Sequence, residues 1–188
     1  AAIAAETKEK VPDLWIMMVG PLEARFLANL VRMTQAKRVL ELGTFTGYSA
    51  LAIAQVLPAD GSIITLDVSE EYTEIARRHW ANSPHAGKID LRLGPGLETL
   101  DAVEGPIDLA FLDADKDNYP HYWDKIVPMM RPGGVIAVDN VLANGEVVTQ
   151  ETEFGAMMDR FNAKVAADER VDVLMLPFRD GVTLAVKR

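Results

Sequence analysis

Residues 39–49 read Val-Leu-Glu-Leu-Gly-Thr-Phe-Thr-Gly-Tyr-Ser, a short apolar run followed by a turn with two glycines. The run Val39–Leu42 is typical of a buried strand, and Tyr48–Leu57 is predicted to be a helix that ends at Pro58. Glycines at a strand-to-helix turn let the backbone approach a ligand closely. A plain connection between a strand and a helix has the same composition, so the turn by itself leaves both interpretations open.

The rest of the chain continues the alternation of strands and helices. We expect strands at Ser62–Leu66, Ile89–Leu93, Ile107–Leu112, Val135–Val138, Val171–Leu176 and Val182–Val186, and helices at Ser69–Ala81, Tyr119–Val127 and Glu151–Ala167. This alternation predicts a mainly parallel sheet with helices on both faces. The tight turn at residues 179–181 makes the last strand antiparallel. Ligands of such sheets bind beyond the carboxyl ends of the strands.

Length and composition fit one globular domain and exclude several classes of protein. The chain has 188 residues, of which 49% are hydrophobic and 25% are charged. It has no cysteine, which excludes a disulfide framework, a thiolate metal site and a cysteine nucleophile. The net charge of −9 argues against a nucleic-acid partner. The longest apolar stretches, such as Trp15–Val19, have five residues, far fewer than the ~20 residues of a membrane span. We expect a cytoplasmic protein with no secretory signal and no membrane partner.

Asp67 ends the second expected strand, 24 residues after Gly43. A carboxylate at this position can accept hydrogen bonds from both hydroxyls of a ribose, although helix N-caps also often carry aspartate. The glycine spacing differs from the Gly-x-Gly-x-x-Gly pattern of nicotinamide-binding proteins. A nicotinamide-dependent oxidoreductase on a similar sheet would share the glycine turn and Asp67, so it stays an alternative.

Residues 112–119 read Leu-Asp-Ala-Asp-Lys-Asp-Asn-Tyr and place three carboxylates within five positions after an expected strand. These charges repel one another, and a divalent cation would remove the repulsion. Lys116 is the only candidate base in this segment. A metal ion nearby would favour its neutral amine, whereas a lysine that only balances the acidic residues would have no catalytic role.

Asp113 and Asp139 end two expected strands that are consecutive in the sequence. If these strands are neighbours, the Cα atoms of the two aspartates lie ~5 Å apart. Together with the amide oxygen of Asn140, the carboxylates would form an all-oxygen cation site. Such ligands favour Mg²⁺, with Mn²⁺ or Ca²⁺ as further possibilities. A solvated acidic loop followed by a helix cap would contain the same residues.

Together these segments resemble the cation-dependent O-methyltransferases of the catechol and caffeoyl-coenzyme A type, which use S-adenosylmethionine. The similarity extends from about Met17 to Arg188, and its motifs are residues 40–49, 112–119 and 138–141. It implies an α/β fold of the Rossmann-like class I methyltransferase type. The mostly parallel sheet would have seven strands, with an antiparallel last strand and helices on both faces. Residues 1–188 would form a single methyltransferase domain, from which we expect the family's N-terminal helix to be missing.

The resemblance implies a set of positions that bind S-adenosylmethionine and its product S-adenosylhomocysteine (SAH). These are Val19, Glu41, Gly43, Thr44, Phe45, Ser49, Asp67, Val68, Gly96 and Asp113. Asp67 would hold the ribose hydroxyls, and Glu41 would bind the amino group of the methionine part. Residues 94–96, Gly-Pro-Gly, resemble the family's Gly-Pro-Ala segment near the adenine.

The resemblance also implies the metal and substrate residues. Asp113, Asp139 and Asn140 would bind the metal, Asp113 and Lys116 would be catalytic with Lys116 as general base, and Asp115, Lys116 and Asn140 would contact the substrate. The expected reaction methylates one hydroxyl of a vicinal aromatic diol, such as a catechol, caffeoyl or flavonoid-like acceptor, in a homodimer. Residues 142–146 depart from the family's Trp and Gly-Arg pattern, which leaves the acceptor open. A metal-independent methyltransferase stays an alternative.

Overall fold

A computed structural model describes residues 2–188 of the chain. These residues form two compact units, with the boundary between Val103 and Glu104. No helix in the described part of the chain combines the length and the apolar character that crossing a bilayer requires. The expectation of a single methyltransferase domain stays a prediction.

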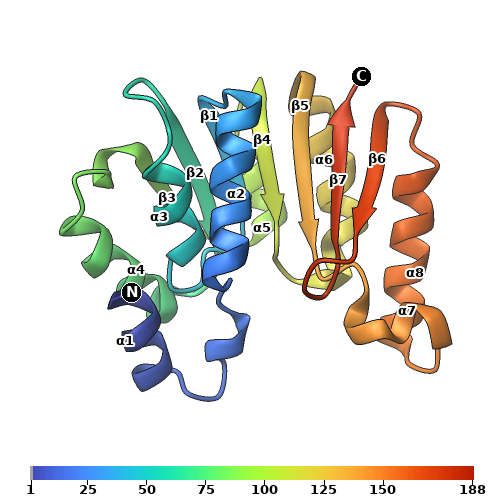
Figure 1. The fold of residues 1–188 in the computed structure, drawn as a ribbon, viewed down its shortest axis with the longest axis horizontal. Coiled ribbons are helices and arrows are strands. Elements are labelled where there is room, and N and C mark those ends of the chain that lie inside the picture. Colours follow the sequence, from blue (N-terminus) through green and yellow to red (C-terminus); the bar gives the residue numbers. More distant parts are fainter. Residues whose placement is uncertain (1) are drawn as a thin grey trace. The chain divides into compact units, whose positions relative to one another are not determined.

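The first unit contains a parallel arrangement of three strands in which β2 lies between β1 and β3. Its elements are β1 (Arg38–Leu42), β2 (Ser62–Asp67), β3 (Ile89–Leu93), α1 (Ala2–Lys10), α2 (Pro21–Thr34), α3 (Tyr48–Ala54), α4 (Glu70–Ala81) and α5 (Gly96–Asp101). Figure 1 shows these strands running downward, so that their carboxyl ends and α1 lie at the same end of the unit. Apolar residues of β1 and β2 are buried, which confirms both predicted strands.

Local signals in the sequence set the bounds of α3 and α4. Ser69 caps α4, because its hydroxyl accepts a hydrogen bond from the backbone N–H of Tyr72 at 3.2 Å. Helix α3 ends at Ala54, three residues before the predicted end at Leu57. The Leu57 N–H still donates to the carbonyl of Ile53 at 3.2 Å, so a looser turn continues the helix.

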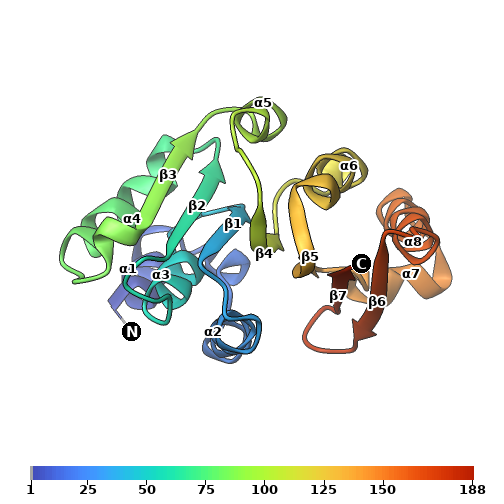
Figure 2. The same cartoon turned by 90° about the horizontal axis from the view of Figure 1, so that it is seen from above.

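The second unit places the two predicted metal-site strands side by side. Its elements are β4 (Ile107–Leu112), β5 (Met130–Asp139), β6 (Val171–Leu176), β7 (Val182–Lys187), α6 (Tyr119–Met129), α7 (Glu146–Thr149) and α8 (Glu153–Ala166). Strands β4 and β5 are parallel, whereas β7 is antiparallel to both β5 and β6, as predicted for the last strand. Figure 2 shows α6 and α8 on the same face of these strands. Phe161 of α8 packs edge-on against Tyr119 and Trp123 of α6.

Gly47 is the point where the glycine turn packs most tightly against α4. It has a φ of +80°, and a Cβ atom there would lie 2.4 Å from the ring of Trp80 and 2.5 Å from the Cβ of Ala76. We expect Gly47→Ala to lower the free energy of unfolding by about 2–4 kcal/mol, because overpacking and left-handed backbone strain add. Urea denaturation measures this difference. Gly87→Ala is the control, because a Cβ atom added at Gly87 would meet nothing within 4 Å. Equal losses of unfolding free energy in both variants would contradict the packing argument.

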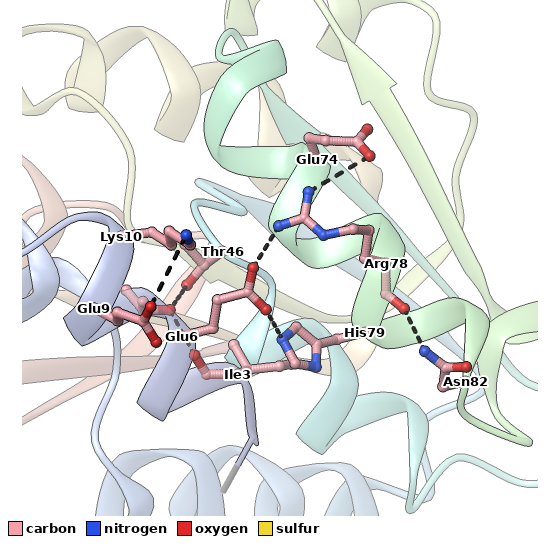
Figure 3. Close-up of polar contacts among 10 residues, drawn as sticks. Ile3, Glu6, Glu9, Lys10, Thr46, Glu74, Arg78, His79 and Asn82 are labelled. Carbon is pink, nitrogen blue, oxygen red and sulfur yellow. Dashed lines mark hydrogen bonds and ion pairs between the residues drawn. The ribbon is translucent and has the colours of Figure 1, made fainter.

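An ion pair joins α1 to α4. Glu6 Oε1 lies 2.5 Å from Arg78 Nη2, and Glu6 Oε2 lies 2.7 Å from His79 Nε2. Figure 3 shows the Glu6 carboxylate between these two side chains, with Glu74 on the far side of Arg78. The hydrogen bond from Arg78, and then the bond to His79, hold the pKa of Glu6 below its ordinary value of 4.5.

A lowered pKa makes the contribution of Glu6 to stability dependent on pH. The contribution is present above the pKa of the unfolded chain and is lost as the pH falls through the lower pKa of the folded chain. We expect Glu6→Gln to be less stable than wild type at neutral pH and equally stable in acid. Urea unfolding at several pH values measures this difference. Glu9→Gln is the control, because the Glu9 side chain is 74% exposed. A deficit of Glu6→Gln that persists in acid would contradict the assignment.

Candidate active site

Asp67 connects the glycine turn to the start of α4. Its Oδ2 accepts hydrogen bonds from the backbone N–H groups of Thr44 at 2.9 Å and Phe45 at 2.7 Å. Its Oδ1 accepts from the N–H of Ser69 at 2.8 Å. The carboxylate therefore fixes the end of β1 against the start of α4. This role comes in addition to the predicted contact with a ribose, which stays a prediction.

Glu41 is a fully buried carboxylate on β1. Its Oε2 accepts a hydrogen bond from the Thr65 hydroxyl at 2.5 Å, and the Thr65 Oγ1 lies 2.5 Å from the Thr44 Oγ1. Because Thr65 donates to Glu41, the Thr44 hydroxyl is the donor to Thr65. Sequence reasoning missed Thr65, and its signal was a hydroxyl residue inside an otherwise apolar buried strand.

Most of the predicted cofactor positions belong to the first unit. Val19 and Ser49 are buried, whereas Val68 is 72% exposed. The Gly94 N–H donates to the carbonyl of Asp67 at 2.9 Å, which holds the start of the Gly96 helix near the end of β2. The remaining positions, Gly43, Thr44, Phe45 and Glu41, follow or end β1. Only Asp113 of the predicted cofactor set belongs to the second unit.

The register of β4 and β5 brings the predicted metal ligands to adjacent strand ends. Leu112 of β4 is paired with Val138 of β5 in a parallel ladder. Asp113 and Asp139 directly follow this pair, so the expected neighbourhood of the two strands is confirmed. Asp139 is 5% exposed, and Asn140 has a φ of 60°. Non-glycine residues adopt this left-handed conformation rarely, and asparagine is one of the residues that tolerate it best.

Lys116 reaches both a predicted metal ligand and a buried phenol. Its Nζ donates to Asp113 Oδ1 and to the Tyr119 hydroxyl, each at 2.7 Å. The Tyr119 hydroxyl lies 3.2 Å from each of the carbonyl oxygens of Leu112 and Asp139, to which it donates. Burial, and then the charges of Asp113 and Asp139, raise the pKa of Tyr119 well above its ordinary value. The phenol therefore stays protonated and acts as a donor to the strand ends.

Asp115 has partners of its own. Its Oδ1 accepts from the Tyr122 hydroxyl at 2.6 Å, and its Oδ2 accepts from the Asn118 side chain. Burial and the bond to Asp115 raise the pKa of Tyr122. Two of the three carboxylates of this segment, Asp113 and Asp115, are thus stabilised by different protein donors. These donors reduce the need for a cation to offset the repulsion between the two groups. The roles of Tyr119 and Tyr122 were not predicted from the sequence. The available signal was the spacing of the two tyrosines, which lie one helical turn apart directly after the acidic segment.

Within residues 2–188, no three His, Cys, Asp or Glu side chains are arranged to hold a metal ion. The predicted set has two carboxylates, Asp113 and Asp139, with the amide of Asn140 as its third member. These donors fit a hard cation that completes its coordination with water, because all of them are oxygens at the end of two paired strands. Metal binding by this set stays a prediction.

A family model described as O-methyltransferase matches residues 2–188. The chain belongs to this O-methyltransferase family. Among its relatives, catechol O-methyltransferase domain-containing protein 1 of Mus musculus is 42% identical, with 88% of this chain and 66% of the relative covered. Caffeoyl-CoA O-methyltransferase 2 of Zea mays is 39% identical, with 90% of this chain and 69% of the relative covered. This methyltransferase thus spans about two thirds of the length of these relatives.

Solved structures support the same family and confirm the predicted fold class. The O-methyltransferase of Bacillus cereus in complex with SAH is 31% identical and has a TM-score of 0.91, with 100% of this chain and 91% of that chain covered. The O-methyltransferase of Streptomyces achromogenes involved in tomaymycin synthesis, in complex with SAM, has a TM-score of 0.90 at 31% identity. The match includes 99% of this methyltransferase and 88% of the Streptomyces achromogenes chain.

Proposed function

We propose that this methyltransferase transfers the methyl group of S-adenosylmethionine to one hydroxyl of a vicinal aromatic diol. The observation that carries the proposal is the pairing of Leu112 with Val138, which sets Asp113 and Asp139 at neighbouring strand ends. Lys116, a candidate base, is hydrogen-bonded to the first of these carboxylates. Relatives named catechol O-methyltransferase domain-containing protein 1 and caffeoyl-CoA O-methyltransferase 2 support a diol acceptor.

The metal proposed for this site is Mg²⁺, with Mn²⁺ or Ca²⁺ as alternatives. Asp113, Asp139 and Asn140 would hold it. When bound, the cation supplies Lewis-acid activation of a diol hydroxyl and orients the acceptor.

Lys116 is proposed to take the proton of the acceptor hydroxyl. The hydroxyl oxygen then forms a bond to the methyl carbon, and the bond between this carbon and sulfur breaks. The electron pair of that bond goes to sulfur, which yields SAH, a methyl ether and protonated Lys116. Tyr119 holds the amine from the buried side, with its hydroxyl 2.7 Å from Nζ. Asp115 and Asn140 are the proposed acceptor contacts.

The first unit is proposed to bind the methyl donor. Two SAH- or SAM-bound relatives of known structure support this assignment. The backbone of the glycine turn, which Asp67 fixes through Thr44 and Phe45, is the surface that a nucleoside can approach closely. Asp67 is proposed to bind the ribose hydroxyls, and Glu41 is proposed to bind the amino group of the methionine part.

Mass spectrometry with S-adenosylmethionine that carries a deuterated methyl group tests the proposed reaction. We expect caffeic acid to gain one labelled methyl group in the presence of Mg²⁺. The matched acceptor p-coumaric acid lacks the second hydroxyl, so we expect it to remain unmethylated. Equal methylation of both acceptors would contradict a vicinal diol as the recognised group. If S-adenosylmethionine is consumed but neither of these acceptors nor any catechol is methylated, a vicinal aromatic diol is not the acceptor.

Removal of the Asp67 carboxylate is expected to weaken the binding of SAH by about 10–100-fold, the equivalent of lost hydrogen bonds to a charged group. Isothermal titration calorimetry on Asp67→Ala measures this change. The same variant is expected to be less stable, because three backbone N–H groups lose their acceptor. Asp90→Ala on the adjacent strand β3 is the control, with an exposed carboxylate. Equal SAH affinities for wild type and Asp67→Ala would refute the ribose assignment.

A methyltransferase that works without a metal is the second candidate. The observation that favours it is that Asp113 is already paired with the Lys116 ammonium and that Asp115 already accepts hydrogen bonds from Tyr122 and Asn118. Turnover in EDTA distinguishes the two candidates. An oxidoreductase is not supported, because the chain belongs to the O-methyltransferase family and its glycine turn lacks the diphosphate pattern.

We further propose that the chain forms a homodimer. Strand β6 ends the order of strands and exposes Val173, Leu174 and Met175, of which Leu174 is 57% exposed. An apolar terminal strand is a surface on which a second copy can pack. Light scattering after size exclusion is expected to give about twice the 20.6 kDa mass of the chain, and a monomer mass would contradict the proposal.

A further inference from the structure

Helix α1 contacts the glycine turn at one buried point. Thr7 and Thr46 are both fully buried, and their Oγ1 atoms are hydrogen-bonded at 2.8 Å. Thr46 lies in the turn between β1 and α3, directly before the tightly packed Gly47. Figure 3 shows the side chain of Thr46 directed toward α1. Within residues 2–188, Thr7 is the only hydrogen-bond partner of the Thr46 hydroxyl.

The ion pair of Glu6 holds α1 in the position that this contact requires. Glu6 and Thr7 are adjacent on α1, and Glu6 binds Arg78 and His79 of α4. Ile3 lies one turn before Thr7 and is also buried, so that α1 presents one short buried face. Helix α1 is therefore fixed to α4 at one residue and to the glycine turn at the next.

The turn is held from two sides. Asp67 accepts the N–H groups of Thr44 and Phe45, while Thr7 binds the hydroxyl of Thr46. The Gly47 N–H closes the turn on the carbonyl of Thr44 at 2.9 Å. A buried hydroxyl that loses its partner is costly, so a turn without Thr7 would shift to hydrate Thr46.

We propose that Thr7 is a positioning residue for the methyl-donor site, which acts through Thr46 to hold the glycine turn in its binding conformation. The inference rests on the proposed function, because it takes the glycine turn as the surface that binds S-adenosylmethionine. A ligand that binds an already ordered turn loses less conformational freedom than one that must order it. The affinity for the methyl donor therefore depends on a residue of α1 that need not touch it.

Thr7→Val tests the inference, because valine keeps the shape of threonine and removes the hydroxyl. We expect the dissociation constant of SAH, measured by calorimetry on the full chain, to rise roughly 3–10-fold. Thr7→Ser keeps the hydroxyl and is expected to bind SAH as wild type does. Thr73→Val is the matched control. Thr73 is also fully buried and also donates to the carbonyl four residues before it, at 2.6 Å. Among residues 2–188, the Thr73 hydroxyl is hydrogen-bonded only to the carbonyls of Ser69 and Glu70, at the start of α4.

A double-mutant cycle shows whether Thr7 acts through Thr46. We expect Thr46→Val to weaken SAH binding no more than Thr7→Val does, because the Thr7 hydroxyl keeps its hydrogen bond to the Ile3 carbonyl at 2.9 Å. The double variant is expected to bind SAH no more weakly than Thr7→Val, because no unpaired Thr46 hydroxyl remains. With an acceptor that turns over, the KM for S-adenosylmethionine should rise in Thr7→Val while kcat at saturation stays unchanged. A purely structural role would produce no such separation.

The outcomes separate the two proposals. If wild type does not bind SAH, the proposed function is wrong and the inference fails with it. If wild type binds SAH and Thr7→Val binds equally well, the inference alone is wrong. Additive losses in the double variant, or a loss of the same size in Thr73→Val, would also overturn the role of the contact between Thr7 and Thr46.

Discussion

Lys116→Ala is expected to lower kcat by about 10²–10⁴-fold at saturating S-adenosylmethionine and Mg²⁺, the usual contribution of a well-placed base. The reason is that Lys116 is the proposed acceptor of the hydroxyl proton, with its amine fixed by Asp113 Oδ1 and the Tyr119 hydroxyl. The alanine variant leaves the glycine turn and Asp67 intact. Steady-state kinetics with caffeic acid measures kcat, and calorimetry checks that the affinity for SAH is unchanged.

Two further variants make this prediction specific to the base. Lys116→Arg keeps a positive charge but stays protonated, so we expect a loss of kcat as large as that of the alanine variant. Lys164→Ala in α8 removes a lysine whose ion pair with Asp124 is on the protein surface, and we expect normal turnover. A kcat for Lys116→Ala that equals wild type across the pH range would end the assignment of Lys116 as the base.

Asp139→Asn is expected to lower turnover in Mg²⁺ by more than about 100-fold. Loss of a residue that only hydrogen-bonds to a metal ligand already lowers metal affinity or activity by about 10–100-fold, and Asp139 is proposed to bind the metal itself. Asparagine has nearly the same shape as aspartate, so β5 and its pairing with β7 should be retained. The binding of SAH should be largely unaffected, since the proposed donor site lies in the first unit. Asp117→Asn is the control, because Asp117 is an exposed carboxylate of the same acidic segment.

Metal titration distinguishes a lost ligand from a general disturbance of the site. For Asp139→Asn we expect the Mg²⁺ concentration at half-maximal activity to rise, and activity to recover only in part in excess Mg²⁺. Asp117→Asn should follow the wild-type curve. Turnover of Asp139→Asn that equals wild type would remove Asp139 from the metal site.

The strands of the fold were predicted from the sequence, whereas the two N-terminal helices were not. Most strands are apolar or alternating runs bounded by glycine, proline or polar residues, which gives a local signal. Strand β5 differs, because it begins at Met130, five residues before the predicted start at Val135, and includes Pro132. Helix α1 has no such pattern, because its buried residues are Ile3 and Thr7, and one of these is polar. Helix α2 begins with Pro21, a favourable first residue that the sequence analysis did not use.

The placement of the candidate site could be predicted where it depends on the backbone. Asp113 and Asp139 are adjacent because consecutive parallel strands end at the same edge, which the sequence pattern implies. The partners of these residues depend on side-chain directions that no sequence pattern encodes. The hydrogen bonds of Tyr119 to Lys116 and of Tyr122 to Asp115 were therefore not predicted. The three hydrogen bonds that Asp67 accepts from the backbone were likewise not predicted.

Methyl transfer with and without a divalent cation tests whether the reaction depends on the proposed metal site. The protein is incubated with S-adenosylmethionine and caffeic acid in Mg²⁺, in EDTA, and in EDTA followed by excess Mg²⁺, and the methylated product is counted by mass spectrometry. We expect product in Mg²⁺, none in EDTA, and product again when Mg²⁺ is restored. Equal product in Mg²⁺ and in EDTA would contradict the metal site formed by Asp113, Asp139 and Asn140, and would favour the metal-independent methyltransferase.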